Sequence, residues 1–464
     1  MFVAENLYPK MKKTYLTCLL WAFILLFPFG NNCQAQNDTL RIMVQNTLHF
    51  GDGCQGTLDF LNSQLEKEVH NLNPDLIGLD KVQAIKLTNA DPYGISPTWY
   101  ADSIIWGSLD VAYPGRYAYC TLTDYSEATD NDMSVLFYNR NKIGFLTVKP
   151  LYIGEEDIDL YKLFYKDPNL NTTHDTTFLY VVLCHTISGT SSTGRDGQAT
   201  QVVDSLKKFF THLPNCIYMG DFNTHNTTEP GYELITQTAD TSFLFYDPPF
   251  HPDNKLTYPI DWTTTPSLAA AQLTTTTRST TNPNSCGNTG GAYDWFDHIF
   301  LSDYIINNYD YIRYIPNSWK SVGNDGNRVG IDINDSITHG KNLSAPSSML
   351  NAEWQFTDKY PVVVELGITY NTTVTGMRAN TQQSEGYVRI NNPVKDLLMA
   401  YFTTNMLGEK ATMELYDVLG RVVYSTSFVV NSLQMTENIN LTPGVYFLHT
   451  QIGEHTYTNK IVKE

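Results

Sequence analysis

The sequence predicts an α/β domain followed by a small domain made only of strands. Two strand-like runs flank an apolar helical pattern near residue 60, and this order is the opening of an α/β unit. The same order of strand, helix and strand recurs between residues 178 and 221. Residues 385–464 differ, because short alternating runs there are separated by turn signals, and this spacing predicts a small β-sandwich.

The first unit begins with the strand candidate L-R-I-M-V-Q-N-T-L, residues 40–48. A helix is expected next, because apolar residues recur at helical spacing at Leu58, Leu61, Leu65, Val69 and Leu72. The run D-L-I-G-L, residues 75–79, is typical of a buried strand.

The second unit consists of a strand candidate over residues 178–185, a helix over 201–210 and a strand candidate over 215–221. Further strands are predicted at residues 133–138, 295–301 and 360–366. Residues 371–384 are polar and unpatterned, so they are expected to be a linker between the α/β domain, residues 36–370, and the sandwich.

The N-terminus has the pattern of a signal peptide. Lys12 and Lys13 precede the apolar run of residues 16–30, and the cleavage motif Cys33-Gln34-Ala35 follows, so residues 1–35 are expected to be removed. A membrane anchor is the alternative, but the run is short and polar residues follow it at once. No other stretch is long and apolar enough to predict a stable membrane span.

Charge argues against one class of function. The first 35 residues carry Lys10, Lys12, Lys13 and Glu5, a net of +2, so the remainder of this −18 chain carries −20. Such a charge repels polyanions at long range, which excludes a protein that coats nucleic acid nonspecifically but leaves room for a local phosphate site.

Five cysteines lie outside the expected signal peptide. Cys184 and Cys216 occur in apolar strand-like runs and are expected to be buried thiols. Cys54, Cys120 and Cys286 occur in loop-like sequence, where an exported protein could form one disulfide, and no pairing follows from the sequence.

Polar residues follow the ends of several predicted strands: Asn46, His185, Asp221 with Asn223, Asp297, and Thr357-Asp358-Lys359. Strand ends in α/β folds bring distant side chains together, so we expect one pocket. Hydrolysis of a phosphodiester needs carboxylates for a divalent cation, donors for phosphate oxygens and a base, and this set contains most of them. Taken singly, each residue is better explained by a turn or a cap.

The order of the motifs resembles that of the endonuclease/exonuclease/phosphatase superfamily. The matching pieces are I-M-V-Q-N, P-D-L-I-G-L-D-K-V-Q, V-L-C-H, R-D-G-Q-A, M-G-D-F-N, F-D-H-I-F-L-S and T-D-K-Y-P-V-V-V. The resemblance implies a four-layer α/β sandwich, in which two packed mixed sheets are flanked by helices, and secreted phosphodiesterase or nuclease activity that depends on Mg²⁺, Mn²⁺ or Ca²⁺.

The resemblance also implies roles for individual residues. Asn46 and Asp358 would lie at the metal site, and His185 and Asn223 would bind the phosphate. Asp221 would align the attacking water, and Asp297 would orient the terminal base.

Two positions depart from the family pattern, which has glutamate at Lys81 as its main metal ligand and histidine at Lys359. An ammonium in place of a carboxylate changes the local charge by two units, and one charge pair at about 4 Å contributes roughly 4 kcal/mol at an effective dielectric near 20. Metal affinity should therefore fall, and acidic neighbours should keep Lys359 protonated and unable to act as a base.

Two hypotheses follow from these changes. In one, Lys81 takes the place of the cation, Lys359 pairs with Asp297, and the protein binds a phosphate-bearing ligand or a partner without turning it over. In the other, Lys81 and Lys359 bind the phosphate beside Asn223 and His185, or Asp80 helps to hold a shifted metal, and nucleic acid or another phosphoester is cleaved.

Residues 385–464 resemble the type A C-terminal sorting domain of the type IX secretion system. The matching pieces are N-P-V-K-D-L-L, M-E-L-Y-D-V-L-G-R-V-V, I-N-L-T-P-G-V-Y-F-L and N-K-I-V-K-E. The resemblance implies a small immunoglobulin-like β-sandwich that engages the type IX machinery, and release of the protein from the cell or its attachment to the cell surface. A generic adhesion module is the alternative.

Overall fold

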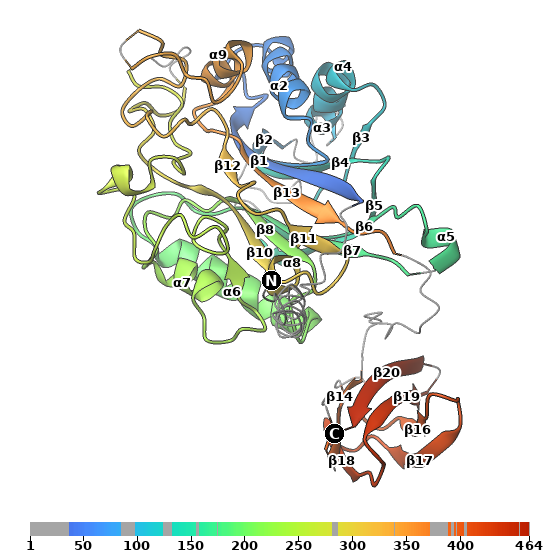
Figure 1. Ribbon diagram of the computed structural model, residues 1–464. Helices are drawn as coiled ribbons and strands as arrows, with labels where there is room; N and C mark the ends of the chain where they lie inside the picture. Colours follow the sequence, from blue (N-terminus) through green and yellow to red (C-terminus); the bar gives the residue numbers. More distant parts are fainter. Residues whose placement is uncertain are drawn as a thin grey trace, which may run out of the picture. The chain divides into compact units, whose positions relative to one another are not determined.

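Two β-sheets packed face to face form the centre of the large unit, and helices cover the outer face of each sheet (Figure 1). This computed structural model describes residues 37–84, 98–123, 132–154, 157–173, 175–280, 286–337, 339–371, 388–390, 394–395, 397–402, 406–453 and 455–463. The expected signal peptide and all but the first residue of the expected linker lie outside these residues.

Within the described residues the first sheet has seven strands in the order β11-β13-β1-β2-β4-β3, with β12 beside β13. Its strands are β1 (Asp38–Phe50), β2 (Leu76–Gln83), β3 (Tyr117–Tyr119), β4 (Asp132–Asn139), β11 (Ile312–Tyr314), β12 (Lys320–Ser321) and β13 (Val362–Ile368). β1 and β2 are parallel, whereas β1 and β13 are antiparallel.

The second sheet has the order β5-β6-β7-β8-β10-β9. Its strands are β5 (Ile143–Tyr152), β6 (Ile158–Tyr165), β7 (Phe178–His185), β8 (Cys216–Asp221), β9 (Phe245–Tyr246) and β10 (Asp297–Ser302). β7 and β8 are parallel, and β10 runs antiparallel to β8.

Figure 1 shows α2, α3, α4 and α9 on one side of the two sheets and α6 and α7 on the other. The described helices of the unit are α2 (Leu58–Leu72), α3 (Trp99–Ile104), α4 (Asp110–Ala112), α6 (Thr193–Phe209), α7 (Pro230–Thr236), α8 (Asp303–Ile306) and α9 (Ser347–Phe356), with a π-helix at Ile105–Leu109 and a 3₁₀ helix at Pro266–Ala269. The short helix α5 (Leu170–Thr173) lies where the chain passes from this unit to the second. Thr57 caps the start of α2 by accepting a hydrogen bond from the N–H of Phe60, and Asn73 ends it in a left-handed conformation.

The alternation of side chains along β1 explains the layers. Leu40, Ile42 and Val44 point into the core between the two sheets, where residues of β7 and β8 meet them. Met43 points the other way, into a second core that includes Leu65 of α2. The four-layer sandwich is therefore confirmed.

The residues after the linker form a second compact unit. One of its sheets pairs β14 (Arg389–Ile390), β15 (Leu397–Tyr401) and β18 (Gln434–Asn438), and the other pairs β16 (Lys410–Tyr416), β17 (Val422–Val429), β19 (Gly444–Ile452) and β20 (His455–Lys463). Side chains of both sheets, such as Leu398 and Met413, share one core, so the expected β-sandwich is confirmed.

Among the described residues, no helix has the length and apolar content needed to cross a bilayer. Cys184 and Cys216 are buried free thiols, as expected, and so is Cys120. Cys54 and Cys286 form a disulfide across 232 residues of sequence, with their Cα atoms 5.9 Å apart.

Candidate phosphate pocket

The polar residues at the strand ends meet where the two sheets adjoin. Within the second sheet His185 is in register with Asp221, and Asp221 with Asp297; within the first, Asn46 is in register with Asp80. Two hydrogen bonds join the sheets here. Asn46 Nδ2 donates to Asp221 Oδ2 at 2.9 Å, and the N–H of Asp221 donates to Asp80 Oδ2 at 3.1 Å.

Asp221 is the central residue of this pocket. Besides Asn46, its carboxylate accepts the N–H of Asn223 at 2.9 Å and faces the Lys359 Nζ atom at 3.5 Å. Burial by itself would raise the pKa of Asp221, but Lys359 and His185, with these hydrogen bonds, outweigh burial and lower the pKa to about 2. Asp221 is therefore ionised at neutral pH.

The backbone conformation on either side of Asp221 determines where the Asn223 side chain lies. Gly220 has φ +145°, and a Cβ atom there would lie 1.7 Å from the carbonyl oxygen of Cys184, so only glycine fits. Asn223 itself is left-handed with φ 47°, a conformation that asparagine adopts more readily than most residues. The turn aims the Asn223 side chain at the end of β7, where Nδ2 donates to the Thr186 carbonyl at 2.8 Å and lies 3.4 Å from His185 Nε2.

Lys359 enters the pocket from the segment before β13. Its Nζ atom donates to Thr275 Oγ1 at 3.0 Å and lies 4.7 Å from the centre of the Phe296 ring, in addition to its ion pair with Asp221. Burial opposes the charge, but Asp221, Asp358 and Asp297 together raise the pKa of Lys359. Lys359 is thus protonated, as expected, and its ion-pair partner is Asp221 rather than Asp297.

Asp297 is fully buried opposite Asp221, and neither of its carboxyl oxygens has a hydrogen-bond partner among the described residues. Burial, followed by repulsion from Asp221, raises the pKa of Asp297 well above its usual range, although Lys359 acts in the opposite direction. The neighbouring carboxyl groups of Asp221 and Asp297 therefore have pKa values shifted in opposite directions.

Lys81 is placed differently from Lys359. It has a left-handed φ of 55° within an irregular stretch of β2, its side chain is partly exposed, and its carbonyl accepts a hydrogen bond from Thr47 Oγ1. No hydrogen bond or ion pair of the Lys81 side chain is found within the described part of the chain. The residue before it, Asp80, is the one that reaches Asp221.

Asp358 is buried and accepts a hydrogen bond from the N–H of Asn288 at 2.7 Å. Its carboxylate also attracts the buried guanidinium of Arg278. The electrostatic effect of Asp358 extends to Lys359, but its hydrogen bond is with the loop that carries Cys286.

The residues expected at a metal site do not fit a divalent cation in this arrangement. Both polar groups of the Asn46 amide are used, because Oδ1 accepts the N–H of Leu48 while Nδ2 donates to Asp221. The Lys359 ammonium contacts Asp221, the hydrogen-bond partner of Asn46, so a cation bound beside Asn46 would meet a fixed positive charge. Over the described ranges, no three His, Cys, Asp or Glu side chains are placed to hold a metal ion.

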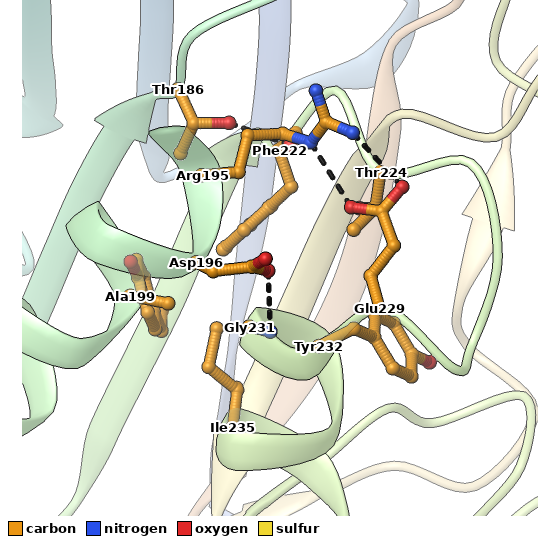
Figure 2. A pocket seen from close by; sticks show the side chains of 11 residues that line it. Thr186, Arg195, Asp196, Ala199, Phe222, Thr224, Glu229, Gly231, Tyr232 and Ile235 are labelled. Carbon is orange, nitrogen blue, oxygen red and sulfur yellow. Dashed lines mark hydrogen bonds and ion pairs between the residues drawn. The ribbon is translucent and has the colours of Figure 1, made fainter. Parts of the chain in front are cut away.

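A small cavity lies between α6, α7 and the ends of β7 and β8, and Phe222 and Thr224 are among the residues that line it (Figure 2). Arg195, from the R-D-G-Q-A motif, binds both oxygens of Glu229 at 3.0 and 3.1 Å, and Glu229 in turn accepts the N–H of His225 at 2.9 Å. Asp196 accepts the N–H of Gly231 at 2.8 Å. These buried contacts fix the chain that leaves the pocket after Asn223.

Two residues of the pocket, Thr275 and Asp80, were not expected in these roles. Thr275 lies in a threonine-rich stretch that has the composition of a surface loop, yet it is fully buried and bridges to Lys359 and Asp294. Nothing in the sequence marks Thr275 as a pocket residue, because only the folded loop brings it to the pocket. Asp80 was expected only as an alternative metal ligand. It could have been found from the alternation along β2, since Gly78, two residues earlier, faces the second sheet.

One part of the chain matches a known protein family directly. Residues 391–464 match the family described as "Secretion system C-terminal sorting domain". The C-terminal unit is a secretion sorting domain. This match confirms the resemblance noted for residues 385–464, and the sorting domain marks the chain for secretion. A search of curated proteins found no match.

Several solved structures are similar to the chain at low identity. The human Nocturnin catalytic domain with bound sulfate is 13% identical, with a TM-score of 0.39, over 72% of this chain and 97% of that one. TDP2 of D. rerio, in complex with a single-stranded DNA product, is 12% identical with a TM-score of 0.40, over 72% and 100% of the two chains. A mannosyl-6-phosphatase of Bacteroides thetaiotaomicron is 15% identical with a TM-score of 0.39, over 70% and 99%.

Proposed function

We propose that the large unit is a secreted member of the endonuclease/exonuclease/phosphatase superfamily and that its pocket binds a phosphate ester. The observation that carries this proposal is the ammonium of Lys359 beside Asp221, in one pocket with Asn223 and His185. Lysine and amide N–H groups are suitable donors for phosphate oxygens, and a protonated imidazole would add a third.

The proposed donors are slightly more accessible than the carboxyl groups beside them. His185, Asn223 and Lys359 keep 8%, 7% and 5% of their surface exposed, whereas Asp221 keeps 1% and Asp80 and Asp297 none. The ionised carboxylate of Asp221 orients the donors by accepting from Asn223 and pairing with Lys359.

Binding can be tested by titrating the secreted chain with phosphate monoesters, phosphodiesters and oligonucleotides in the calorimeter, with EDTA present. We expect Asn223→Ala to weaken binding at least tenfold, because a donor is removed. Asn317→Ala is the matched control: Asn317 is also left-handed, with φ 63°, but it is exposed and its N–H donates to Asp253. Equal binding by the wild type and both variants would contradict a phosphate pocket at Asn223.

A second candidate function is hydrolysis of the bound ester, and the different ionisation of Asp221 and Asp297 favours it. Neighbouring carboxyl groups whose environments separate their pKa values are suited to act as a base and an acid. The assays should measure release of nitrophenol from bis-nitrophenyl phosphate and cleavage of DNA and RNA. Each assay should be run with Mg²⁺, Mn²⁺, Ca²⁺ or EDTA. Turnover that Asp221→Asn abolishes would establish an enzyme, and sensitivity to EDTA would show that a metal takes part. Ligand binding without turnover would leave recognition as the function.

We also propose the route of export. Residues 1–35 direct the chain through the inner membrane, and the C-terminal unit then engages the type IX machinery, which releases the protein or attaches it to the surface. The support is the match of residues 391–464 to the sorting domain. Mass spectrometry of the exported protein should find Gln36 at the N-terminus, and an intact Met1 or Met11 would contradict the proposal.

A further inference from the structure

Lys359 is held in the pocket by contacts of three kinds. Its Nζ atom has an ion pair with Asp221 at 3.5 Å, a hydrogen bond to Thr275 Oγ1 at 3.0 Å and a position 4.7 Å from the centre of the Phe296 ring. Only 5% of the residue is exposed. A lysine fixed by an anion, a hydroxyl and a ring face is a defined part of the pocket rather than a mobile surface charge.

The groups around this ammonium are mostly acidic. Asp221 touches it, and Asp297 and Asp358 attract it electrostatically. Asp80 joins the same group through the N–H of Asp221 and contributes to the field at Asp297. A cluster of buried carboxyl groups needs a positive charge within it, and Lys359 supplies that charge here.

We propose that Lys359 is the resident cation of the pocket, so that its ammonium occupies the place beside Asp221 that a divalent metal ion would otherwise take. An arriving metal would meet a fixed positive charge and would compete with Lys359 and Asn46 for the same oxygen, Asp221 Oδ2. The pocket can therefore bind an anion without a metal, and removal of the Lys359 charge opens a metal site.

The alternative, that Lys81 is this cation, agrees less well with the structure. Lys81 is partly exposed, and the main groups that lower the pKa of Asp221 are Lys359, His185, Asn223 and Asn46. The two lysines therefore form a matched pair for experiment, since both stand where the family pattern has a metal-site or catalytic residue.

The experiment compares Mn²⁺ binding by the wild type, Lys359→Met and Lys81→Met in the whole secreted chain. Calorimetry gives the affinity, and electron paramagnetic resonance gives the amount of bound Mn²⁺. We expect no binding by the wild type or Lys81→Met at millimolar Mn²⁺, and at least tenfold tighter binding by Lys359→Met. Addition of Asp221→Asn to Lys359→Met should abolish the gain.

The inference is overturned if the wild type binds Mn²⁺ and Asp221→Asn removes that binding, or if Lys359→Met gains no affinity. A gain by Lys81→Met in its place would assign the role to the other lysine. If Lys359→Met does not fold, Lys359→His at pH 8, where imidazole is largely neutral, serves as the second variant.

A second experiment, on phosphate binding, distinguishes failure of this inference from failure of the proposed function. The inference rests on that proposed function for the identity of its ligand. In EDTA, Lys359→Met should bind a phosphate ester at least tenfold more weakly than the wild type, and Mn²⁺ should restore the affinity. Absence of ester binding by the wild type would contradict the proposed function, whereas the Mn²⁺ results would still decide whether Lys359 is the resident cation.

Discussion

Asp221 and Asp297 face each other across two antiparallel strands, yet the structure keeps them in different ionisation states. The difference arises from their partners. Asp221 receives the Lys359 ammonium and N–H groups of Asn46 and Asn223, whereas Asp297 is equally buried and lacks such donors within the described residues. A second negative charge at Asp297 would be costly next to the first.

The neutral state of Asp297 predicts how stability changes with pH. Its pKa is raised on folding, so the folded protein holds a proton that the unfolded chain releases above about pH 4, and stability falls as pH rises. Asp297→Asn removes this dependence. Between pH 5 and pH 8 the variant should lose less stability than the wild type, measured by urea unfolding. Exposed Asp204→Asn is the control, and parallel curves for all three proteins would refute the neutral state.

Gly220 leads to a prediction based on backbone geometry. Its φ is positive, and a Cβ atom at this position would lie only 1.7 Å from the Cys184 carbonyl oxygen, so there is no space for a side chain. Gly220→Ala should destabilise the fold by about 3 kcal/mol or more, as seen by thermal unfolding. Gly189→Ala is a suitable comparison, because Gly189 also has a positive φ, +105°, while its Cβ would meet nothing within 4 Å. Similar losses in both variants would show that the conformation alone matters.

For single residues, the sequence predicted which residues form the pocket better than it predicted which of them contact one another. The structure brings Asn46, His185, Asp221 and Asp297 together. His185 and Asp221 end β7 and β8, whereas Asp297 begins β10 and Asn46 lies within β1. The partner of Lys359 could not be predicted, because the choice between Asp221 and Asp297 depends on side-chain direction and on Thr275, which arrives from a distant loop. The irregular backbone at Lys81, which separates it from Asp80, is likewise a product of folding.

Among the elements, α2 and α9 share an unusual contact. Glu68 and Glu353 are fully buried between these helices, and their carboxyl oxygens have no hydrogen-bond partner in the described ranges. Burial raises the pKa of Glu68 to about 8, and burial together with Glu68 raises that of Glu353 well above its usual range. Other polar groups at this place are Gln45 of β1 and the buried Tyr360. α9 ends at Phe356, directly before Thr357-Asp358-Lys359.

This pair makes stability fall as the pH rises from acid to neutral. Because the pKa of Glu68 is raised on folding, stability is complete below about pH 4.5 and decreases until about pH 8. Glu68→Gln should therefore be more stable than the wild type at pH 8 by a few kcal/mol, with a smaller difference at pH 5. Denaturant unfolding at both values tests this, with partly exposed Glu66→Gln on the same helix as the control. If the stability difference between Glu68→Gln and the wild type is no larger at pH 8 than at pH 5, the result argues against a raised pKa of Glu68.

The elements themselves were largely predictable, because their apolar periods are clear. The strand runs and the first helix of the α/β units lie where the sequence placed them, but α6 begins at Thr193, eight residues before the expected helix over 201–210, and β5 and β6 were not predicted. The layers follow from the apolar faces of β1 and α2. Short strands such as β9 and β12 were not predicted. They contain two residues each, and only pairing with β10 and β13 defines them.

For the whole molecule, the division into two units predicts separable functions. Each unit has its own core, and the sorting domain lies entirely in the second. A chain that ends at Asn371 should bind the phosphate ester and unfold as the full chain does, but should accumulate in the periplasm. Cell fractionation and calorimetry of the truncated protein test both statements. If the truncated protein appears in the medium at the level of the full chain, the sorting domain is not needed for export.

The Cys54–Cys286 disulfide links the loop after β1 to the loop that supports Asp358. Reductants in the cytosol keep thiols apart, so this link closes only in an oxidising compartment. The loop that supports Asp358 therefore gains its covalent link to the loop after β1 only once the chain has left the cytosol.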